Sequence, residues 1–254
     1  MQGTLKRWFT RTIRRAGYQL INVRKMHEFD GLHTVHNPRF REDPRFQAAY
    51  GRALQASNGV DPKTAWRIHV GLWAASVASR LPGDFVECGV NSGFLSSAIL
   101  SYLDWDGLGK RFYLVDTFDG PVLTQFSREE IERGRLAVAE QCLSAGAYVT
   151  DMERVRRNYS EWSRIEIVKG CVPDVLPAVR TERIAFLHLD MNCAFPEAAA
   201  LRYFWPYIGS GGIVLFDDYA YFGCDEQARA IDAAAAALGA QILVLPTGQG
   251  MIVK

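Results

Sequence analysis

The sequence lacks several features that would place it in a well-defined class of proteins. It has no apolar run of about 18 residues, so we expect no membrane-spanning helix. Its five cysteines are odd in number and form no CxxC pair, which argues against a disulfide scaffold or a zinc site and for a reducing compartment. Its first residues contain no apolar stretch of roughly 7–15 residues like that of a secretory signal. These absences predict a cytoplasmic protein.

Acidic residues are missing from one part of the chain. Residues 1–25 contain seven cations and no acid, although the whole chain has a formal net charge of only +1. Apolar side chains recur among these cations at helical spacing, which predicts a basic amphipathic helix. These side chains are Leu5, Trp8, Phe9 and Ile13. Such a helix either lies on an anionic membrane surface or packs on the acidic body or on a second subunit, and we expect a homo-oligomer. The body carries no basic stripe, which argues against nucleic acid as a partner.

The chain divides into two regions of different composition. Residues 1–60 are polar and rich in turns, and we expect a helical extension that forms a lid or an oligomer contact. A helix is predicted to begin with Asp61 as its N-cap and Pro62 in its first position, and to end near residues 81–83. Residues 61–254 form the second region, which we expect to be one domain.

Short apolar strands alternate with helices in this second region. We expect strands at residues 85–86, 112–115, 165–168, 184–189, 213–216, 242–245 and 251–253. We expect helices at 94–103, 128–145, 196–205 and 225–238. The alternation predicts an α/β fold with a mostly parallel seven-stranded sheet covered on both faces. The turn at 246–250 is too short for a helical crossover, so the last strand should be antiparallel.

Acids follow four of the predicted strands. They are Glu87, Asp116, Asp190, Asp217 and Asp218. Ligands bind beyond the carboxyl ends of the strands in open α/β sheets, so these acids should converge. Two carboxylates about 4 Å apart repel by about 4 kcal/mol at an effective dielectric constant of about 20. Few basic residues follow these strands, which favours a bound cation: a divalent metal at Asp190, Asp217 and Asp218, a cationic ligand, or both. A single acid in such a place is more often a helix N-cap.

The loop after the first of these strands is rich in glycine but does not read GxGxxG. It contains Gly89 and Gly93, which would let the backbone turn away from the strand and open the next helix beside a ligand. Asp116 follows the next strand, in the position of a carboxylate that binds a ribose diol. Loop and acid together predict a cofactor that contains a nucleoside.

Four sets of motifs resemble those of a known family. They read GDFVECGV at residues 83–90 with a glycine at 93, VDTFDG at 115–120, GCVPDVLP at 170–177, and LHLD at 187–190 with DDY at 217–219. Together they resemble the macrocin O-methyltransferase family of class I S-adenosylmethionine (SAM) methyltransferases, over residues 63–254. The resemblance implies a Rossmann-like class I methyltransferase fold. It also implies metal-dependent transfer of a methyl group to a hydroxyl of a small molecule, either a sugar or a specialised metabolite.

The resemblance implies roles for individual residues. Those that would hold SAM are Glu87, Gly89, Ser92, Gly93, Asp116, Thr117, Gly170 and Cys171. Those that would hold Mg²⁺ or another divalent cation are Asp190, Asp217 and Asp218. Asp190 would accept the proton of the acceptor hydroxyl, or else serve only as a metal ligand. The family usually has a second acid where this chain has Asn192, so a metal would be held less tightly. His188 is expected to face a helix and not the substrate.

Two other functions compete with this interpretation. A nicotinamide-dependent oxidoreductase would share the fold, but the chain has neither GxGxxG nor an evident Ser-Tyr-Lys set for proton transfer. A non-catalytic protein could bind SAM or a partner through the same fold, with its metal site degraded at Asn192.

Overall fold

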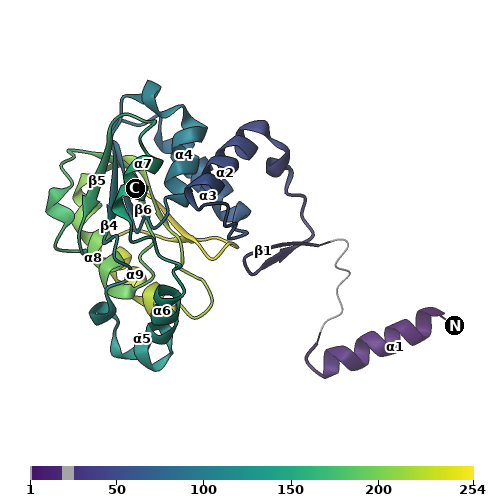
Figure 1. Ribbon diagram of the computed structural model, residues 1–254. Coiled ribbons are helices and arrows are strands. Elements are labelled where there is room, and N and C mark those ends of the chain that lie inside the picture. Colours follow the sequence, from purple (N-terminus) through teal and green to yellow (C-terminus); the bar gives the residue numbers. More distant parts are fainter. Residues whose placement is uncertain (1, 19–25) are drawn as a thin grey trace. The chain divides into compact units, whose positions relative to one another are not determined.

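The computed structural model describes residues 2–18 and 26–254 and divides the chain into two units, residues 1–38 and 39–254. The first unit contains the helix α1 (Gln2–Arg15) and an antiparallel pair of short strands, β1 (His27–Phe29) and β2 (Leu32–Thr34) (Figure 1). The predicted basic helix is therefore present, with Trp8 and Phe9 exposed. The rest of the predicted basic segment, residues 19–25, lies outside the described residues.

The second unit is built on a seven-stranded sheet with the order β5-β4-β3-β6-β7-β9-β8. Its strands are β3 (Asp84–Cys88), β4 (Phe112–Asp116), β5 (Ile165–Lys169), β6 (Ile184–Leu189), β7 (Ile208–Phe216), β8 (Leu243–Val244) and β9 (Gly250–Val253). Neighbouring strands from β5 to β7 are parallel, whereas β9 runs antiparallel to both β7 and β8. The order reverses between β3 and β6, where ligands bind in open α/β sheets. The predicted sheet and its antiparallel last strand are confirmed.

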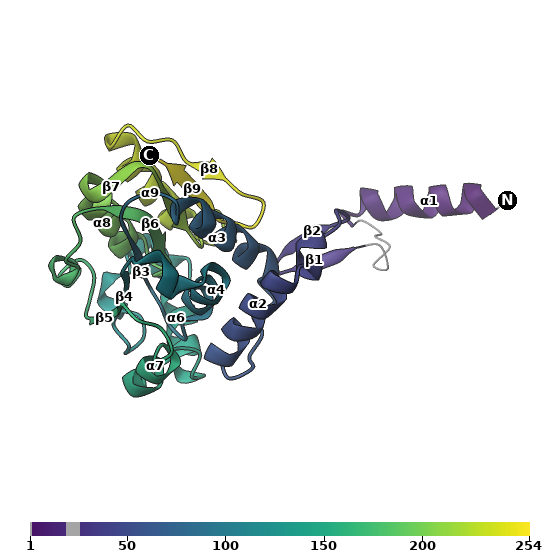
Figure 2. The ribbon, with the colours of Figure 1, turned by 90° about the horizontal axis from the view of Figure 1, so that it is seen from above.

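Helices cover both faces of the sheet, as the alternating pattern predicts. They are α2 (Pro44–Ala56), α3 (Ala65–Ala78), α4 (Phe94–Leu103), α5 (Arg128–Glu132), α6 (Arg135–Ser144), α7 (Met152–Asn158), α8 (Ala194–Phe204) and α9 (Asp225–Ala237), with short 3₁₀ turns at Arg39–Glu42, Trp105–Leu108, Leu123–Gln125, Leu176–Ala178 and Trp205–Tyr207. Figures 1 and 2 show α2, α3 and α4 together on one face and α8 and α9 on the other. Among the described residues, no helix is long and apolar enough to cross a bilayer.

The side chains of successive residues in each central strand point alternately to the two faces of the sheet. Val86 of β3 and Leu187 of β6 belong to one hydrophobic core together with Leu201 of α8. Phe85 and Phe186, their neighbours in sequence, point to the opposite face, where their ring centroids lie 5.2 Å apart. Strands buried on both faces read as continuous apolar runs, which is why the sequence shows them clearly.

Several predicted boundaries differ from the structure. The helix expected to begin after Asp61 begins at Ala65, because the Asp61 carboxylate accepts hydrogen bonds from the Tyr50 hydroxyl at 2.6 Å and the Lys63 backbone N–H at 2.8 Å. The helix predicted over 128–145 is split into α5 and α6 at Gly134, which has a φ of +80°.

The boundary between the two regions also lies at a different residue from the one we expected. The structure divides the chain after Pro38, not after residue 60. The helix α2, which we assigned to the extension, packs against α4 and so belongs to the larger unit. The extension in front of it is a helix and a β hairpin, not helical throughout.

Candidate active site

The loops that follow β3, β4, β6 and β7 meet at the carboxyl edge of the sheet. Three of them contain a non-glycine residue with positive φ: Asn91 at +49°, Phe118 at +46° and Asn192 at +56°. A side chain in this left-handed region costs about 1–2 kcal/mol for an ordinary residue, and such positions gather at functional sites. The strained loops surround the cavities described below.

Both glycines of the first loop are required by close contacts. At Gly89, where φ is +87°, an added Cβ would lie 1.8 Å from the backbone oxygen of Asp190. At Gly93, where φ is +79°, it would lie 2.0 Å from the hydroxyl oxygen of Tyr159. The first contact brings the β3 and β6 loops together, and the second seats the start of α4 on the chain after α7.

The Asp116 carboxylate holds these loops in place. One of its oxygens accepts the backbone N–H groups of Val90 at 2.7 Å and Asn91 at 2.9 Å, and the other accepts that of Phe118 at 2.7 Å. The acid therefore ties the β3 loop to the β4 loop. Contact of Asp116 with a ribose stays a prediction.

Two cavities open at this edge. The first has a volume of about 120 Å³, and the predicted residues that line it are Gly89, Asp116, Thr117, Gly170 and Asp190. The second has a volume of about 450 Å³, and the predicted residues that line it are Glu87, Gly89, Ser92, Asp190 and Asp217. Of the other predicted residues, Gly93, Cys171 and Asp218 line neither cavity.

The two cavities share a wall. It is formed by Gly89, Asn91, Val149 and Asp190. A ligand that extends from one cavity into the other would therefore pass these residues, Asp190 among them.

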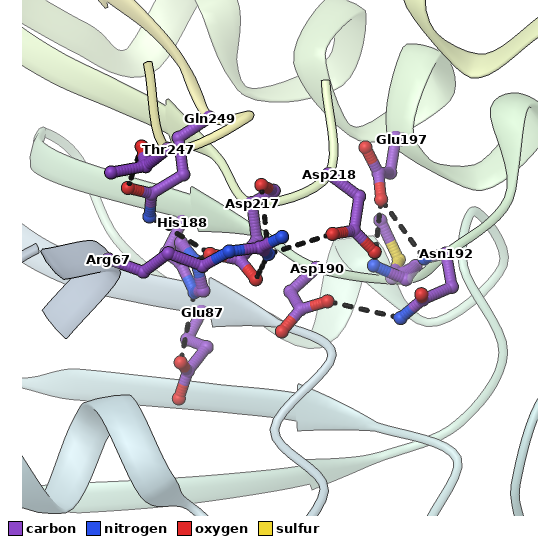
Figure 3. Close-up of polar contacts among 11 residues, drawn as sticks. Arg67, Glu87, His188, Asp190, Asn192, Glu197, Asp217, Asp218, Thr247 and Gln249 are labelled. Carbon is purple, nitrogen blue, oxygen red and sulfur yellow. Dashed lines mark hydrogen bonds and ion pairs between the residues drawn. The ribbon is translucent and has the colours of Figure 1, made fainter. Parts of the chain in front are cut away.

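The charges expected to repel one another are partly neutralised by a residue far away in the sequence. Arg67 of α3 places Nη1 2.7 Å from Asp217 Oδ2 and 2.8 Å from Asp218 Oδ1 (Figure 3). Its guanidinium also lies 4.6 Å from the centroid of the Tyr221 ring, and the residue is only 7% exposed. The protein thus supplies a cation at this site from its own side chains. The sequence interpretation missed it because it considered only the residues that follow the strands.

A buried histidine on β6 lies between two of these acids. His188 Nδ1 is 3.0 Å from Glu87 Oε1, and its Nε2 is 4.0 Å from Asp217 Oδ1. Burial alone would lower the pKa of His188, but Glu87 and Asp217 outweigh it and raise the pKa to about 10. The raised pKa favours the protonated form of His188 at neutral pH. His188 lines the second cavity, whereas the sequence led us to expect it to face a helix.

Asp190 stands apart from these ion pairs. One of its carboxylate oxygens accepts a hydrogen bond from Asn192 Nδ2 at 3.1 Å. Burial, followed by the charges of Asp217 and Asp218, raises the pKa of Asp190 well above its ordinary value. By contrast, burial would raise the pKa of Asp217, but its neighbours His188 and Arg67 outweigh burial and lower it. The pKa values of these neighbouring aspartates are therefore shifted in different directions. Asp190, whose pKa is raised well above its ordinary value, lines both cavities and is the candidate for the group that accepts a proton.

A fully buried acid fixes the loop that carries Asp190. Glu197 of α8 accepts the backbone N–H groups of Met191 at 2.8 Å and Asn192 at 3.1 Å on one oxygen (Figure 3). Burial raises the pKa of Glu197 to about 8. Its place inside a predicted helix gave no sign of this role.

Comparison with known proteins identifies the family. Residues 70–237 match the sequence profile of Macrocin-O-methyltransferase (TylF). This chain belongs to that family.

Curated relatives and solved structures agree with this membership. The chain is 28% identical over 153 residues, 58% of its length and 57% of the relative's, to 8-demethyl-8-(2,3-dimethoxy-alpha-L-rhamnosyl)-tetracenomycin-C 4'-O-methyltransferase of Streptomyces olivaceus. It is 26% identical over 161 residues, 60% of its length and 61% of the relative's, to mycinamicin III 3''-O-methyltransferase of Micromonospora griseorubida. The chain thus spans less than two thirds of either relative.

Two solved structures share the fold. The O-methyltransferase NovP has a TM-score of 0.65 at 18% identity, covering 86% of this chain and 99% of NovP. The calicheamicin methyltransferase CalS11 has a TM-score of 0.56 at 17% identity, covering 93% of this chain and 98% of CalS11. The Rossmann-like class I methyltransferase fold is therefore confirmed for this member of the macrocin O-methyltransferase family.

The metal site implied by the family resemblance does not fit the side chains of this member. An ion bridging Asp217 and Asp218 would have to displace Arg67 or lie about 4 Å from it, where a dication and a guanidinium repel by roughly 8 kcal/mol at a dielectric constant of about 20. Asn192 turns its NH₂ group, not an oxygen, toward Asp190. Among the residues that the structure describes, no three His, Cys, Asp or Glu side chains are grouped to hold a metal ion.

The sequence did contain one signal for Arg67. On α3 it shares a helical face with Gly71, Ala74 and Ala78, which are all buried. A cation on a face of small buried residues needs a buried partner, because an unpaired buried charge is strongly destabilising. The acids after β7 were the available partners.

Proposed function

We propose that this chain transfers a methyl group from SAM to a hydroxyl group of a sugar or of a specialised metabolite. The observation that carries the proposal is the meeting of two cavities at Asp190, an acid whose raised pKa suits it to take a proton. The names of the curated relatives, a rhamnosyl-tetracenomycin 4'-O-methyltransferase and a mycinamicin III 3''-O-methyltransferase, support the substrate class. All five cysteines are free, which supports a cytoplasmic location.

The residues around the cavities fit SAM. The first cavity combines the polar groups of Asp116 and Thr117 with the apolar walls of Val122 and Val172, as a nucleoside requires. In the second cavity Glu87 has a buried carboxylate oxygen, Oε2, without a hydrogen-bond partner among the described residues. An ammonium group, such as that of the methionine part of SAM, would satisfy it. When bound, SAM supplies a methyl group that a nucleophile can take by in-line displacement.

The chain's own contribution is to position the acceptor and to remove its proton. One oxygen of Asp190 is engaged by Asn192, and we assign the other to the acceptor hydroxyl. Proton removal of this kind contributes roughly 10²–10⁴-fold to a rate. Holding the hydroxyl within roughly 3–3.5 Å of the methyl group contributes further by orientation. The rigid β6 loop, held by Glu197, keeps Asp190 beside the cofactor loop.

The test separates binding from transfer. Purified protein is titrated with SAM by calorimetry and then assayed with labelled SAM against a panel of rhamnosylated and other glycosylated acceptors. Asp190→Asn should bind SAM with nearly the affinity of the wild type and lose most of the transfer. Asp225→Asn, which changes an exposed acid at the start of α9, should keep both SAM binding and transfer at the level of the wild type.

Other outcomes distinguish the competing functions. Absence of SAM binding would refute the proposal and return attention to nicotinamide dinucleotides. Tight SAM binding without transfer to any acceptor would favour the non-catalytic binding protein. Transfer that survives Asp190→Asn would refute the assignment of the base.

A further inference from the structure

The carboxyl edge of the sheet carries its own cation in the position where the sequence predicted a metal. The guanidinium of Arg67 bridges Asp217 and Asp218, with Nη1 at 2.7 Å from one carboxylate and 2.8 Å from the other. It thereby performs the electrostatic task of a bridging ion, which is to hold two adjacent carboxylates together. We propose that Arg67 replaces the divalent cation in this chain, and that its methyl transfer, resting on the function proposed above, needs no metal.

Arg67 is not placed to leave this position easily. Its side chain is only 8% exposed and is stacked on the Tyr221 ring. Nη1 also lies 3.3 Å from the backbone oxygen of Asp217, so three acceptors hold the same nitrogen. The helix that carries Arg67 packs closely on α4, since an added Cβ at Gly71 would lie 2.6 Å from the Leu95 side chain. A guanidinium so enclosed is a fixed part of the wall.

The remaining oxygens are engaged in ways that suit a protein cation better than a metal. Asp217 Oδ1 accepts a hydrogen bond from Gln249 Nε2 at 2.9 Å, so both oxygens of this carboxylate already have protein donors. Asp190 accepts an N–H from Asn192, where an oxygen would be needed to complete a set of ligands. Mg²⁺ requires near-octahedral oxygen coordination and gives up its water reluctantly. The acids that converge here are therefore partners of a side chain and not a set of metal ligands.

A consequence follows for the acceptor. Arg67 lines the second cavity together with His188 and Asp190, so an acceptor in that cavity meets N–H donors and a carboxylate. Selection of the acceptor then depends on hydrogen bonds of fixed direction from a planar guanidinium, not on chelation of two neighbouring hydroxyls by a metal.

The experiment measures metal binding and transfer separately. The full chain is treated with a chelator, freed of it, and titrated with Mg²⁺ and with Mn²⁺ by calorimetry, with the melting temperature as a second readout. Transfer from SAM is then measured with excess chelator and with Mg²⁺. We expect no binding heat for either ion, an unchanged melting temperature, and rates that agree within about twofold.

Variants test whether Arg67 is the reason. Arg67→Met removes the charge but keeps much of the length, and it should leave two carboxylates that bind Mn²⁺ and raise the melting temperature in its presence. Any transfer left in Arg67→Met should rise at least several-fold on addition of Mg²⁺. Arg80→Met, which changes an exposed arginine just after the same helix, should behave like the wild type. If Arg67→Met does not fold, Arg67→Lys, which keeps the charge, should fold and stay indifferent to metal.

The results that overturn the proposal are distinct from those that overturn the function. A wild-type chain that binds Mg²⁺ or Mn²⁺ tightly, or that loses more than tenfold of its transfer on chelation and regains it with Mg²⁺, refutes the replacement of the metal. A wild-type chain that binds SAM but transfers no methyl group with or without Mg²⁺ refutes the proposed function, while the metal titrations still decide the role of Arg67.

Discussion

The buried His188 makes the stability of the fold depend on pH in a way that can be measured. Its side chain is enclosed between Glu87 and Asp217, and these acids raise its pKa from 6.5 to about 10. The folded chain therefore keeps a proton that the unfolded chain releases above pH 6.5. By linkage, the stabilisation is fully present below pH 6.5 and is lost as the pH rises through about 10.

The size of the effect follows from the same values. Each unit of pKa shift corresponds to about 1.36 kcal/mol, so the contribution of His188 should fall by about 3–4 kcal/mol between pH 6.5 and about pH 9.5. Glu197 adds a slope of the same sign at lower pH, because its raised pKa of about 8 means that the folded state holds a proton between pH 4.5 and 8. The contribution of Glu197 is present both in the wild type and in a variant at position 188, so it cancels in the difference between their free energies of unfolding.

The assay is urea unfolding followed by tryptophan fluorescence at a series of pH values. His188→Gln should be less stable than the wild type at pH 6.5, and the difference should shrink by about 3–4 kcal/mol toward pH 9.5. His36→Gln, which changes an exposed histidine, should run parallel to the wild type. If the curves of His188→Gln and the wild type are parallel as well, His188 is not held as an imidazolium and the reasoning fails.

Three further predictions concern the site and the first unit. The transfer rate should fall as the pH drops through the raised pKa of Asp190, above 3.8, and this limb should be absent from the residual activity of Asp190→Asn, as a pH–rate profile would show. Gly89→Ala should lower the free energy of unfolding by at least roughly 3 kcal/mol and impair SAM binding, because its Cβ would lie 1.8 Å from a backbone oxygen. Gly134→Ala, with a similar φ of +80° and nothing within 4 Å of the Cβ, should cost only about 1–2 kcal/mol, and equal losses would refute the steric argument. The exposed Trp8 and Phe9 on a basic helix should bind anionic vesicles, and deletion of residues 1–25 should abolish co-sedimentation, whereas equal binding to neutral vesicles would contradict the role of charge.

The elements that could be predicted are those specified by local pattern. The strands β3, β4 and β6 are apolar runs buried on both faces, and α4 follows a glycine turn, so these elements were recognisable from the sequence alone. The short turn before β9 forced an antiparallel pairing, which the structure confirms. The hairpin β1–β2 and the helix α7 were missed, because each is short and has a largely exposed surface with little periodicity.

The arrangement of the site depends on pairs that are distant in sequence. Asp190, Asp217 and Asp218 were recognisable as acids at strand ends, but the cation that joins two of them comes from residue 67, on a helix that precedes the first strand of the sheet. The start of that helix was also misplaced, because Asp61 bonds to Tyr50 and not to the helix. Neither partner could be inferred from spacing, since each depends on how helices pack over the sheet.

The close contact between Gly89 and the carbonyl of Asp190 couples the loop after β3 to the loop after β6, so that they form one rigid unit. The backbone N–H of Asp190 also donates to the carbonyl of Cys88 at 2.9 Å, so the β3 and β6 exits cannot shift independently. Entry and release of ligands must then rely on the outer walls, residues 57–64 and 120–126, which belong to other segments. Substitutions in those walls can therefore change the shape of both cavities without moving the loops that carry Gly89 and Asp190.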